Sequence, residues 1–149
     1  MRAVVTRVRE ASVTIDGAVC GAIGRGFLIL LGIGPEDTRC EATKLAEKIL
    51  GLRVFTDADG KMNLDLQSVD GQVLVVSQFT LYGSVRKGRR PSFVGAAPPE
   101  LAIPLYEFFL QECSRLGYLP QHGEFGADMQ VASVNDGPVT LWIDTDLLA

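Results

Sequence analysis

Two uninterrupted apolar runs, at residues 27–31 and 73–76, are the clearest pattern in the chain. Both are short and rich in Val, Leu and Ile, which is typical of strands that are buried on both faces. Gly24-Arg25-Gly26 breaks the chain just before the first run. Further strands are expected where apolar and polar residues alternate or β-branched residues gather, at 2–9, 12–15, 18–20, 53–55, 128–134 and 139–143.

Two longer segments repeat apolar residues with the period of an amphipathic helix. The first begins at Thr38, which has capping-box spacing to Glu41, and ends at Gly51. The second begins at Pro98-Pro99-Glu100 and runs to about Leu116. We therefore expect two main helices, well separated in the sequence.

Three clusters of turn-forming residues divide the strands. Asp16-Gly17 lies between two β-rich arms and predicts a hairpin with a type I′ turn, because Gly takes a positive φ at little cost. Asn135-Asp136-Gly137-Pro138 predicts a turn between the last two strands. Asp57-Ala58-Asp59-Gly60 predicts a turn that resembles a calcium loop. Its glycine comes at the fourth position rather than the sixth and Lys61 replaces a ligand, so calcium is rejected.

Together these elements predict an α+β fold, a single domain over residues 1–149 with a curled or barrel-like β-sheet and two main helices packed outside. No segment approaches the roughly 18 uncharged apolar residues of a membrane span, and charges scattered through residues 1–9 exclude a signal peptide. The three cysteines, Cys20, Cys40 and Cys113, fit neither a zinc site nor a disulfide framework. They indicate a reducing cytosol, so we expect a cytoplasmic protein.

Polar residues gather where the second apolar run ends. Ser77, Gln78 and Thr80 lie within four positions, before Gly83 ends the element. Strand alternation would place Ser77 and Phe79 on one face and Gln78 and Thr80 on the other. Such polar groups need partners, and each costs about 1–3 kcal/mol if it has none. Neighbouring backbone could satisfy any one of them, whereas the whole cluster favours a functional site.

A basic loop follows directly, with Arg86, Lys87, Arg89 and Arg90 in five positions. The chain as a whole carries a net charge of −4, and its isoelectric point of about 4.9 argues against a general nucleic-acid coat. A local basic strip suits a few phosphates of one defined ligand. Taken alone, the strip could equally be a solvated loop.

The common catalytic motifs do not occur in this sequence. His122 is the single histidine, and with no nucleophile motif near it the simplest interpretation is an exposed loop residue. A Walker loop, a dinucleotide fingerprint and His/Cys metal spacing are all missing, so we expect no cofactor and no metal. Composition and periodicity leave three classes open. They are an enzyme, a non-catalytic RNA- or DNA-binding module that uses residues 86–90, and a structural or interaction protein. In the last class, the polar side chains of residues 77–80 would only form hydrogen bonds with neighbouring backbone groups.

Two motifs resemble the signature pair of the D-aminoacyl-tRNA deacylases: Ser77-Gln78-Phe79-Thr80-Leu81 and Asn135-Asp136-Gly137-Pro138-Val139-Thr140. Either motif alone is weak, but both at this separation are specific. The likeness covers essentially the whole chain. Supporting pieces are Arg7-Val8, Asp16-Gly17, Gly24-Arg25-Gly26, Arg90-Pro91-Ser92-Phe93 and Phe125-Gly126-Ala127-Asp128-Met129.

The resemblance implies hydrolysis of the ester that joins a D-amino acid to the terminal ribose of tRNA, a proofreading activity that rejects L-aminoacyl-tRNA but not glycine. The resemblance assigns catalysis to Ser77, Gln78, Phe79 and Thr80. The hydroxyls of Ser77 and Thr80 and the backbone N–H groups of Phe79 and Thr80 would hold the ester carbonyl. Gln78 and Phe79 would bind the adenosine and the acyl group. The ester is already activated, so position and an oxyanion hole can suffice, with the tRNA 2′-hydroxyl assisting the attacking water. Thr80 is either a covalent nucleophile or an oxyanion donor, and the lack of a base favours the donor.

The resemblance also implies a homodimer. A cis peptide bond at Gly137-Pro138 would enter the partner subunit's site, where its carbonyl oxygens hold the substrate's α-ammonium and its backbone fills the space of an L side chain. Gly137 permits this approach because it has no Cβ. Arg7 would support that segment, and Arg86, Lys87, Arg89 and Arg90 would bind phosphates of the aminoacyl-tRNA acceptor end.

Overall fold

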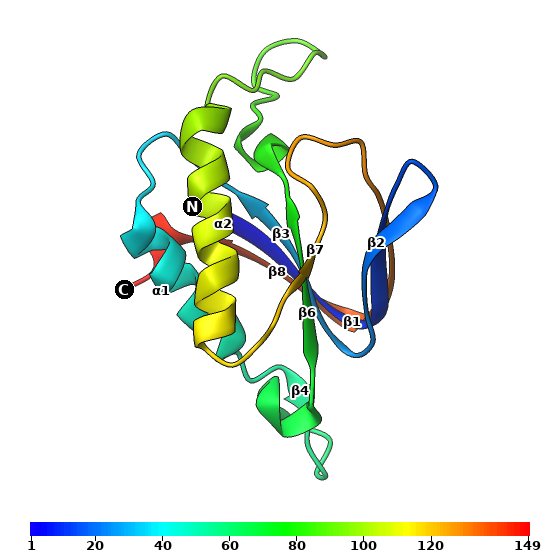
Figure 1. Cartoon of the computed structure of the whole chain (residues 1–149). Helices are drawn as coiled ribbons and strands as arrows, with labels where there is room; N and C mark the ends of the chain where they lie inside the picture. The colour runs from blue at the N-terminus through cyan, green and yellow to red at the C-terminus, as the bar shows by residue number, and fades with distance from the viewer.

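The computed structural model describes residues 1–149 and consists of a mixed β-sheet with two helices side by side on one face (Figure 1). This arrangement confirms the predicted α+β fold. No helix in it is long and apolar enough to cross a lipid bilayer. The elements are β1 (Arg2–Ile15), β2 (Ala18–Ile23), β3 (Gly26–Gly32), α1 (Arg39–Leu50), β4 (Phe55–Thr56), β5 (Met62–Leu64), β6 (Gln72–Ser77), α2 (Pro99–Arg115), β7 (Gln121–His122) and β8 (Gln130–Asp144), with short 3-10 helices η1 (Gln67–Val69), η2 (Phe79–Tyr82) and η3 (Thr145–Leu147).

The long strand β1 organises the sheet. Along one edge it pairs antiparallel with β3 through its first half and with β2 through its second half, and along the other edge it pairs with β8. Strand β6 runs parallel to β3 and to β7. The sheet then curls so far that β2 approaches β7, where a Cβ on Gly21 would lie only 2.9 Å from the carbonyl oxygen of His122. The result is the barrel-like sheet that the sequence predicted.

Apolar side chains pack on both faces of the sheet. The larger core cluster, of 24 buried residues, lies between the sheet and the two helices and includes Phe27 and Ile29 of β3. The smaller cluster, of 7 buried residues, fills the inside of the curled sheet and includes Leu28, Leu74 and Val76. Alternate residues of β3 and β6 therefore point into different clusters, as expected for strands without polar positions.

Local sequence signals fixed several elements as predicted. Asp16 and Gly17 both have positive φ, 49° and 78°, as a type I′ hairpin requires. Thr38 and Glu41 form the predicted capping box, in which Cys40 N–H donates to Thr38 Oγ1 at 3.1 Å and Thr38 N–H donates to Glu41 Oε2 at 2.7 Å. The second helix starts at Pro99, directly after Pro98, also as predicted.

Three expectations were wrong. The predicted strand 53–55 exists only as Phe55–Thr56, because Arg53 instead donates to the backbone and side chain of Asn63. His122 is exposed as expected, but it lies in β7 and pairs with Val75 rather than in an irregular loop. The predicted turn at 135–138 is part of one continuous strand, β8. This strand tolerates the turn-forming residues because it bulges there, as described below.

Candidate functional site

The polar cluster after the second apolar run lies where β6 ends and η2 begins. Ser77 is the last residue of β6, and Gln78 N–H donates to Leu31 O of the neighbouring strand at 2.7 Å. The chain then turns into η2, so the expected alternation of faces from Ser77 to Thr80 was wrong beyond Ser77. The first intrahelical bond runs from Leu81 N–H to Gln78 O, at 3.2 Å. The N–H groups of Phe79 and Thr80 precede it and have no acceptor within η2.

The side chains of this segment are accessible to a ligand. Ser77 and Gln78 are half-buried, whereas Phe79 and Thr80 are exposed. The side-chain amide of Gln78 donates to Thr80 Oγ1, which orients the hydroxyl. An amide cannot take up a proton at neutral pH, so this contact does not activate Thr80 as a nucleophile.

A hollow of about 300 Å³ opens beside this segment. One wall is formed by Val76, Ser77, Gln78 and Phe79, which places three of the four predicted catalytic residues on one cavity, while Thr80 does not line it. The opposite wall consists of residues 125–129 and Val131. Residues 125–129 belonged to the resemblance without a role in the predicted site, and the fold brings them to it. Phe125 is held there against Tyr106 of α2, with ring centroids 5.9 Å apart.

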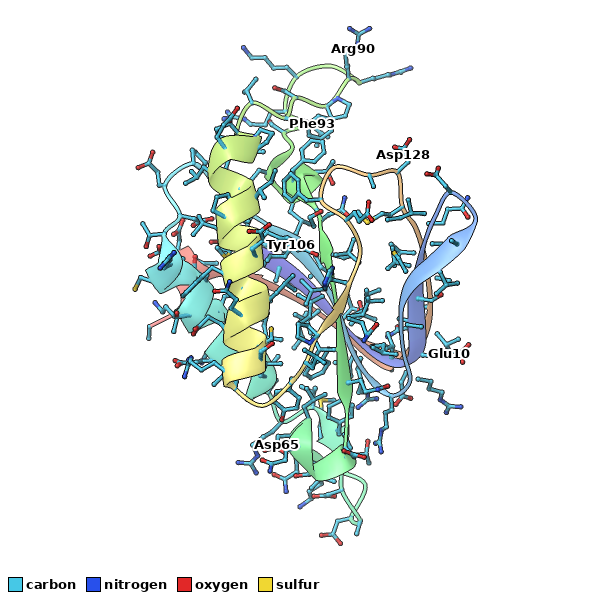
Figure 2. All side chains as sticks on the ribbon, viewed as in Figure 1. Glu10, Asp65, Arg90, Phe93, Tyr106 and Asp128 are labelled. Atoms are coloured by element: carbon cyan, nitrogen blue, oxygen red, sulfur yellow. The ribbon has the colours of Figure 1, made fainter.

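The predicted basic loop projects from the same end of the molecule, and Figure 2 shows Arg90 at its tip and Phe93 between that tip and the rest of the molecule. Ser84 and Ser92 close the loop with two backbone hydrogen bonds of 2.8 and 2.9 Å. The side chains of the loop are exposed and none forms an ion pair with a carboxylate: Arg86, Lys87, Arg89 and Arg90. Four unpaired cations therefore lie close to the hollow.

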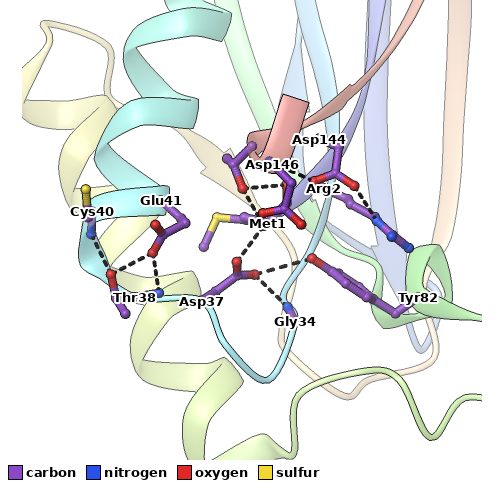
Figure 3. A network of polar contacts seen from close by, with 11 residues as sticks. Met1, Arg2, Gly34, Asp37, Thr38, Cys40, Glu41, Tyr82, Asp144 and Asp146 are labelled. Atoms are coloured by element: carbon purple, nitrogen blue, oxygen red, sulfur yellow. Dashed lines mark hydrogen bonds and ion pairs between the residues drawn. The ribbon is translucent and has the colours of Figure 1, made fainter. Parts of the chain in front are cut away.

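A polar network connects η2 to the first strand (Figure 3). Arg2 Nη1 donates to Leu81 O at 3.2 Å, and Arg2 Nε donates to Asp144 Oδ2 at 2.8 Å. Burial by itself would raise the pKa of Asp144, but the hydrogen bonds from Arg2 and from Asp146 N–H outweigh it and the pKa lies below its ordinary value. A charged pair thus fixes the backbone at the end of η2.

Tyr82 is the second link in this network. Its hydroxyl lies 3.4 Å from Asp37 Oδ2, and burial together with the charge of Asp37 raises the pKa of Tyr82 above its ordinary range. The buried carboxylate of Asp37 also accepts hydrogen bonds from the Met1 ammonium and from Gly34 N–H. A Cβ on Gly34 would lie 2.8 Å from the ring of Tyr82, so glycine is required for the ring to lie there.

The segment around Gly137 is a bulge opposite Arg7. Thr6 pairs with Thr140 and Val8 with Asn135, so residues 136–139 of β8 stand opposite the single residue Arg7. Arg7 is buried, and it donates from Nε to Asp136 O at 2.8 Å and from Nη1 to Val54 O. The amide of Asn135 donates to Arg7 O and Val139 O, at 3.0 and 3.3 Å. The bulge is therefore held from both sides.

The Gly137-Pro138 peptide bond is cis, which confirms the prediction made from the resemblance, and both residues are exposed. Neither residue lines the hollow of its own chain. Arg7 pairs with Phe27 at the start of β3, whereas Ser77 pairs with Leu31 near its end, and β1 and β3 separate β8 from β6. Val131 of β8 does line the hollow, but Gly137 and Pro138 come six and seven residues later in the same strand and do not. The fold thus brings Arg7 and Gly137-Pro138 together but does not bring them to residues 77–80.

The chain is similar to a well-defined set of proteins. A family model described as D-Tyr-tRNA(Tyr) deacylase matches residues 4–144. Proteins named D-aminoacyl-tRNA deacylase from Roseiflexus castenholzii and Desulfatibacillum aliphaticivorans are 61% and 59% identical over 145 residues, covering 97% of this chain and 92% and 99% of theirs. One from Salmonella newport is 52% identical over 143 residues, covering 96% of this chain and 99% of its own.

Solved structures agree with these matches. A structure named "c-Myc DNA Unwinding Element Binding Protein" has a TM-score of 0.90 and 46% sequence identity, covering 97% of this chain and 98% of its own. A second, described as a "probable eukaryotic D-amino acid tRNA deacylase", has a TM-score of 0.81 at 16% identity, covering 95% of this chain and 97% of its own, and shows the same fold.

The fold, the amide groups at the start of η2 and these matches define a member of a family of carboxylic ester hydrolases. The chain belongs to the D-aminoacyl-tRNA deacylase family, and the resemblance found in its two motifs is confirmed.

Proposed function

We propose that this protein hydrolyses the ester bond of D-aminoacyl-tRNA, releasing the free D-amino acid and tRNA. The observation that carries the proposal is the hollow at the end of β6, lined by Ser77, Gln78 and Phe79 at the start of η2, in a member of the D-aminoacyl-tRNA deacylase family. Members of the family act on aminoacyl-tRNA, and a cytoplasmic location is part of this proposal because it would put the protein beside that substrate.

Catalysis in this proposal rests on position and on stabilisation of the oxyanion. The ester carbonyl lies against Ser77, and the N–H groups of Phe79 and Thr80 donate to the negative charge that develops when water attacks. The bond between the carbonyl carbon and the ribose oxygen then breaks. The ribose oxygen takes a proton that comes from the attacking water and leaves as a hydroxyl group. The tRNA 2′-hydroxyl assists the water, as the family resemblance implies. Thr80 acts as a donor, because its hydroxyl contacts the amide of Gln78 and no base.

The active unit in this proposal is a homodimer in which Gly137-Pro138 of each subunit enters the hollow of its partner. Both residues are exposed, follow Asp136, whose carbonyl accepts a hydrogen bond from the buried Arg7, and do not line the hollow of their own chain. Strand β8 also pairs on one edge only, which leaves its other edge open to a second copy. Backbone in the space of an L side chain excludes L substrates by a clash and leaves D substrates and glycine unhindered.

A second candidate function is the binding of DNA or RNA without catalysis. It is favoured by the name of the structure that is 46% identical and by the four unpaired cations of residues 86–90. The net charge of −4 opposes binding over a broad surface. In a pure binding module, replacement of Arg89 and Arg90 abolishes the function and replacement of Thr80 has no effect.

The deciding experiment compares hydrolysis of D-Tyr-, L-Tyr- and Gly-charged tRNA by the purified protein. We expect rapid release of D-Tyr, release of Gly, and no release of L-Tyr above the uncatalysed rate. Release of L-Tyr as fast as D-Tyr would contradict the selection by the partner's Gly137-Pro138. If no D-Tyr is released, the proposed hydrolase function is contradicted and binding of DNA or RNA without catalysis is favoured.

A further inference from the structure

We propose that Phe93 stacks on the nucleotide that precedes the terminal adenosine of the tRNA, and that it forms a subsite between the hollow and the basic loop. The inference rests on the proposed function and deepens it, because it assigns a residue to the single-stranded 3′ end rather than to the reacting ester.

Two aromatic rings are exposed beside the hollow. Phe79 is 52% exposed and Phe93 is 39% exposed, whereas the other five Phe side chains are buried or half-buried. The two rings contact each other edge to face, with centroids 5.3 Å apart and planes at 76°. Aromatic rings that are fixed by contact with each other and remain partly exposed are suited to stack on planar ligands.

The backbone fixes Phe93 in this place. A Cβ on Gly83 would lie 2.8 Å from the ring of Phe93, so the ring packs directly on the chain that leaves η2. The preceding residue, Ser92, is bonded twice to Ser84, which follows Gly83. The position of Phe93 is therefore coupled to the end of η2 and does not depend on the tip of the loop.

The order of groups along the surface matches the order of groups in the substrate. The hollow is bordered by Phe79, Phe79 contacts Phe93, and the loop with its four unpaired cations extends beyond Phe93 (Figure 2). The substrate presents an acyl ester, then adenosine, then further nucleotides joined by phosphates. Proteins that bind single strands pair aromatic side chains with bases and cations with the backbone in this way. The terminal adenine then meets Phe79 and the next base meets Phe93.

The test uses three D-tyrosyl esters: of adenosine, of a trinucleotide that ends in the same adenosine, and of whole tRNA. For Phe93→Ala we expect kcat/KM to fall about tenfold or more on the trinucleotide and the tRNA, through KM, because loss of one stacked base has that size. Activity on the adenosine ester stays within about twofold of wild type and serves as the control for folding. Phe93→Trp restores the long substrates, and Val94→Ala, one position on and 94% exposed, changes none of the three.

Two outcomes would overturn the proposal. An equal loss on all three esters means that Phe93 only supports Phe79. An unchanged kcat/KM on the trinucleotide means that no base stacks there. Both outcomes leave the proposed function intact, since the wild type still cleaves the esters. Failure of the wild type on every ester would instead contradict the function itself.

Discussion

The guanidinium carbon of Arg2 lies 4.3 Å from the centre of the Tyr82 ring. This cation–π contact, with the hydrogen bonds of Arg2 to Asp144 and to Leu81 O, attaches η2 to β1 and β8, the first and last strands of the chain. The N–H groups proposed to stabilise the oxyanion are at the other end of the same short helix. Arg2 is therefore positioned to hold the catalytic backbone without contacting the substrate.

Replacing Arg2 with Met should lower both stability and turnover. Asp144 is buried, and without Arg2 it loses its charged partner, which costs about 1–3 kcal/mol. We expect kcat to fall while KM for D-Tyr-tRNA changes little, because Leu81 O and η2 are no longer held. Arg2→Lys keeps the charge and should recover part of both. Urea unfolding and steady-state kinetics measure the two effects, and a normal kcat in a destabilised Arg2→Met would show that the contact has no role in catalysis.

The stability of the protein should depend on Asp144 in acid. The pKa of Asp144 is lower in the folded chain than its ordinary value of 3.8, so the ionised carboxylate stabilises the fold. This contribution is present above about pH 4 and is lost as pH falls through the folded-state pKa. Because Glu41, Asp57, Asp65 and Glu112 also have lowered pKa values, the comparison must be with Asp144→Asn. Its free energy of unfolding should fall less steeply below pH 4 than that of the wild type, and parallel curves would contradict this role.

Thr80→Ala should retain measurable activity on D-Tyr-tRNA. Loss of one oxyanion contact costs about 10²- to 10³-fold in kcat, whereas loss of a covalent nucleophile costs about 10⁶-fold. Thr80→Ser keeps the hydroxyl and serves as the control. Mass spectrometry of wild-type protein quenched during turnover is the complementary measurement, and an acyl group on Thr80 would show the donor assignment to be wrong.

The cations of residues 86–90 should contribute binding rather than chemistry. In Arg89→Ala/Arg90→Ala we expect a higher KM for tRNA and a weaker dependence of kcat/KM on salt, with kcat nearly unchanged, because fewer counterions are released on binding. Lys48→Ala/Lys61→Ala makes the same change in net charge at exposed positions away from the loop. An equal fall of kcat at saturating tRNA would place Arg89 and Arg90 in the transition state instead.

Mixing two impaired variants should raise activity if the site is completed by the partner. One variant carries Ser77→Ala and Thr80→Ala, and the other carries Gly137→Val, which adds a side chain where even a Cβ would lie 3.1 Å from Asn135 Oδ1. A mixed dimer has one hollow with intact residues from both chains. We expect faster D-Tyr-tRNA hydrolysis after co-expression than from either variant alone. No recovery, in a mixture shown by sedimentation to contain dimers, would contradict the insertion of Gly137-Pro138.

The sequence predicted those features that depend on near neighbours. The hairpin at Asp16-Gly17 and the capping box of Thr38 follow from residues at most three positions apart. The bulge of β8 does not, because its Asp136 carbonyl is bound by Arg7, 129 residues away in the chain. The turn-forming residues at 135–138 predicted that the strand would end, but β8 continues past them because it pairs with β1 on both sides of the bulge.

The site divides in the same way. Ser77, Gln78 and Phe79 are adjacent in sequence and line one hollow together, as the polar cluster indicated. The opposite wall, with Phe125, reaches them because β7 pairs parallel with β6, so that the chain after His122 continues beside the end of β6. A signal for this wall existed in the motif at residues 125–129, but its place beside Ser77 depends on the pairing of β7 with β6, two strands that are far apart in the sequence.

The smaller core cluster, inside the curled sheet, and the hollow beside Ser77 are built partly from the same residues. Val76 is a buried member of the inner cluster, Met129 packs against that cluster, and both line the hollow. A Cβ on Gly123 would lie 2.4 Å from the sulfur of Met129, so the thioether has no spare room on that side. A substitution of Val76 or Met129 that reshapes the hollow therefore also leaves a cavity in the core or overpacks it. If the hollow holds the acyl group, as proposed, changes of substrate side-chain preference should alter thermal stability as well, and directed evolution of new preferences should require compensating mutations inside the barrel.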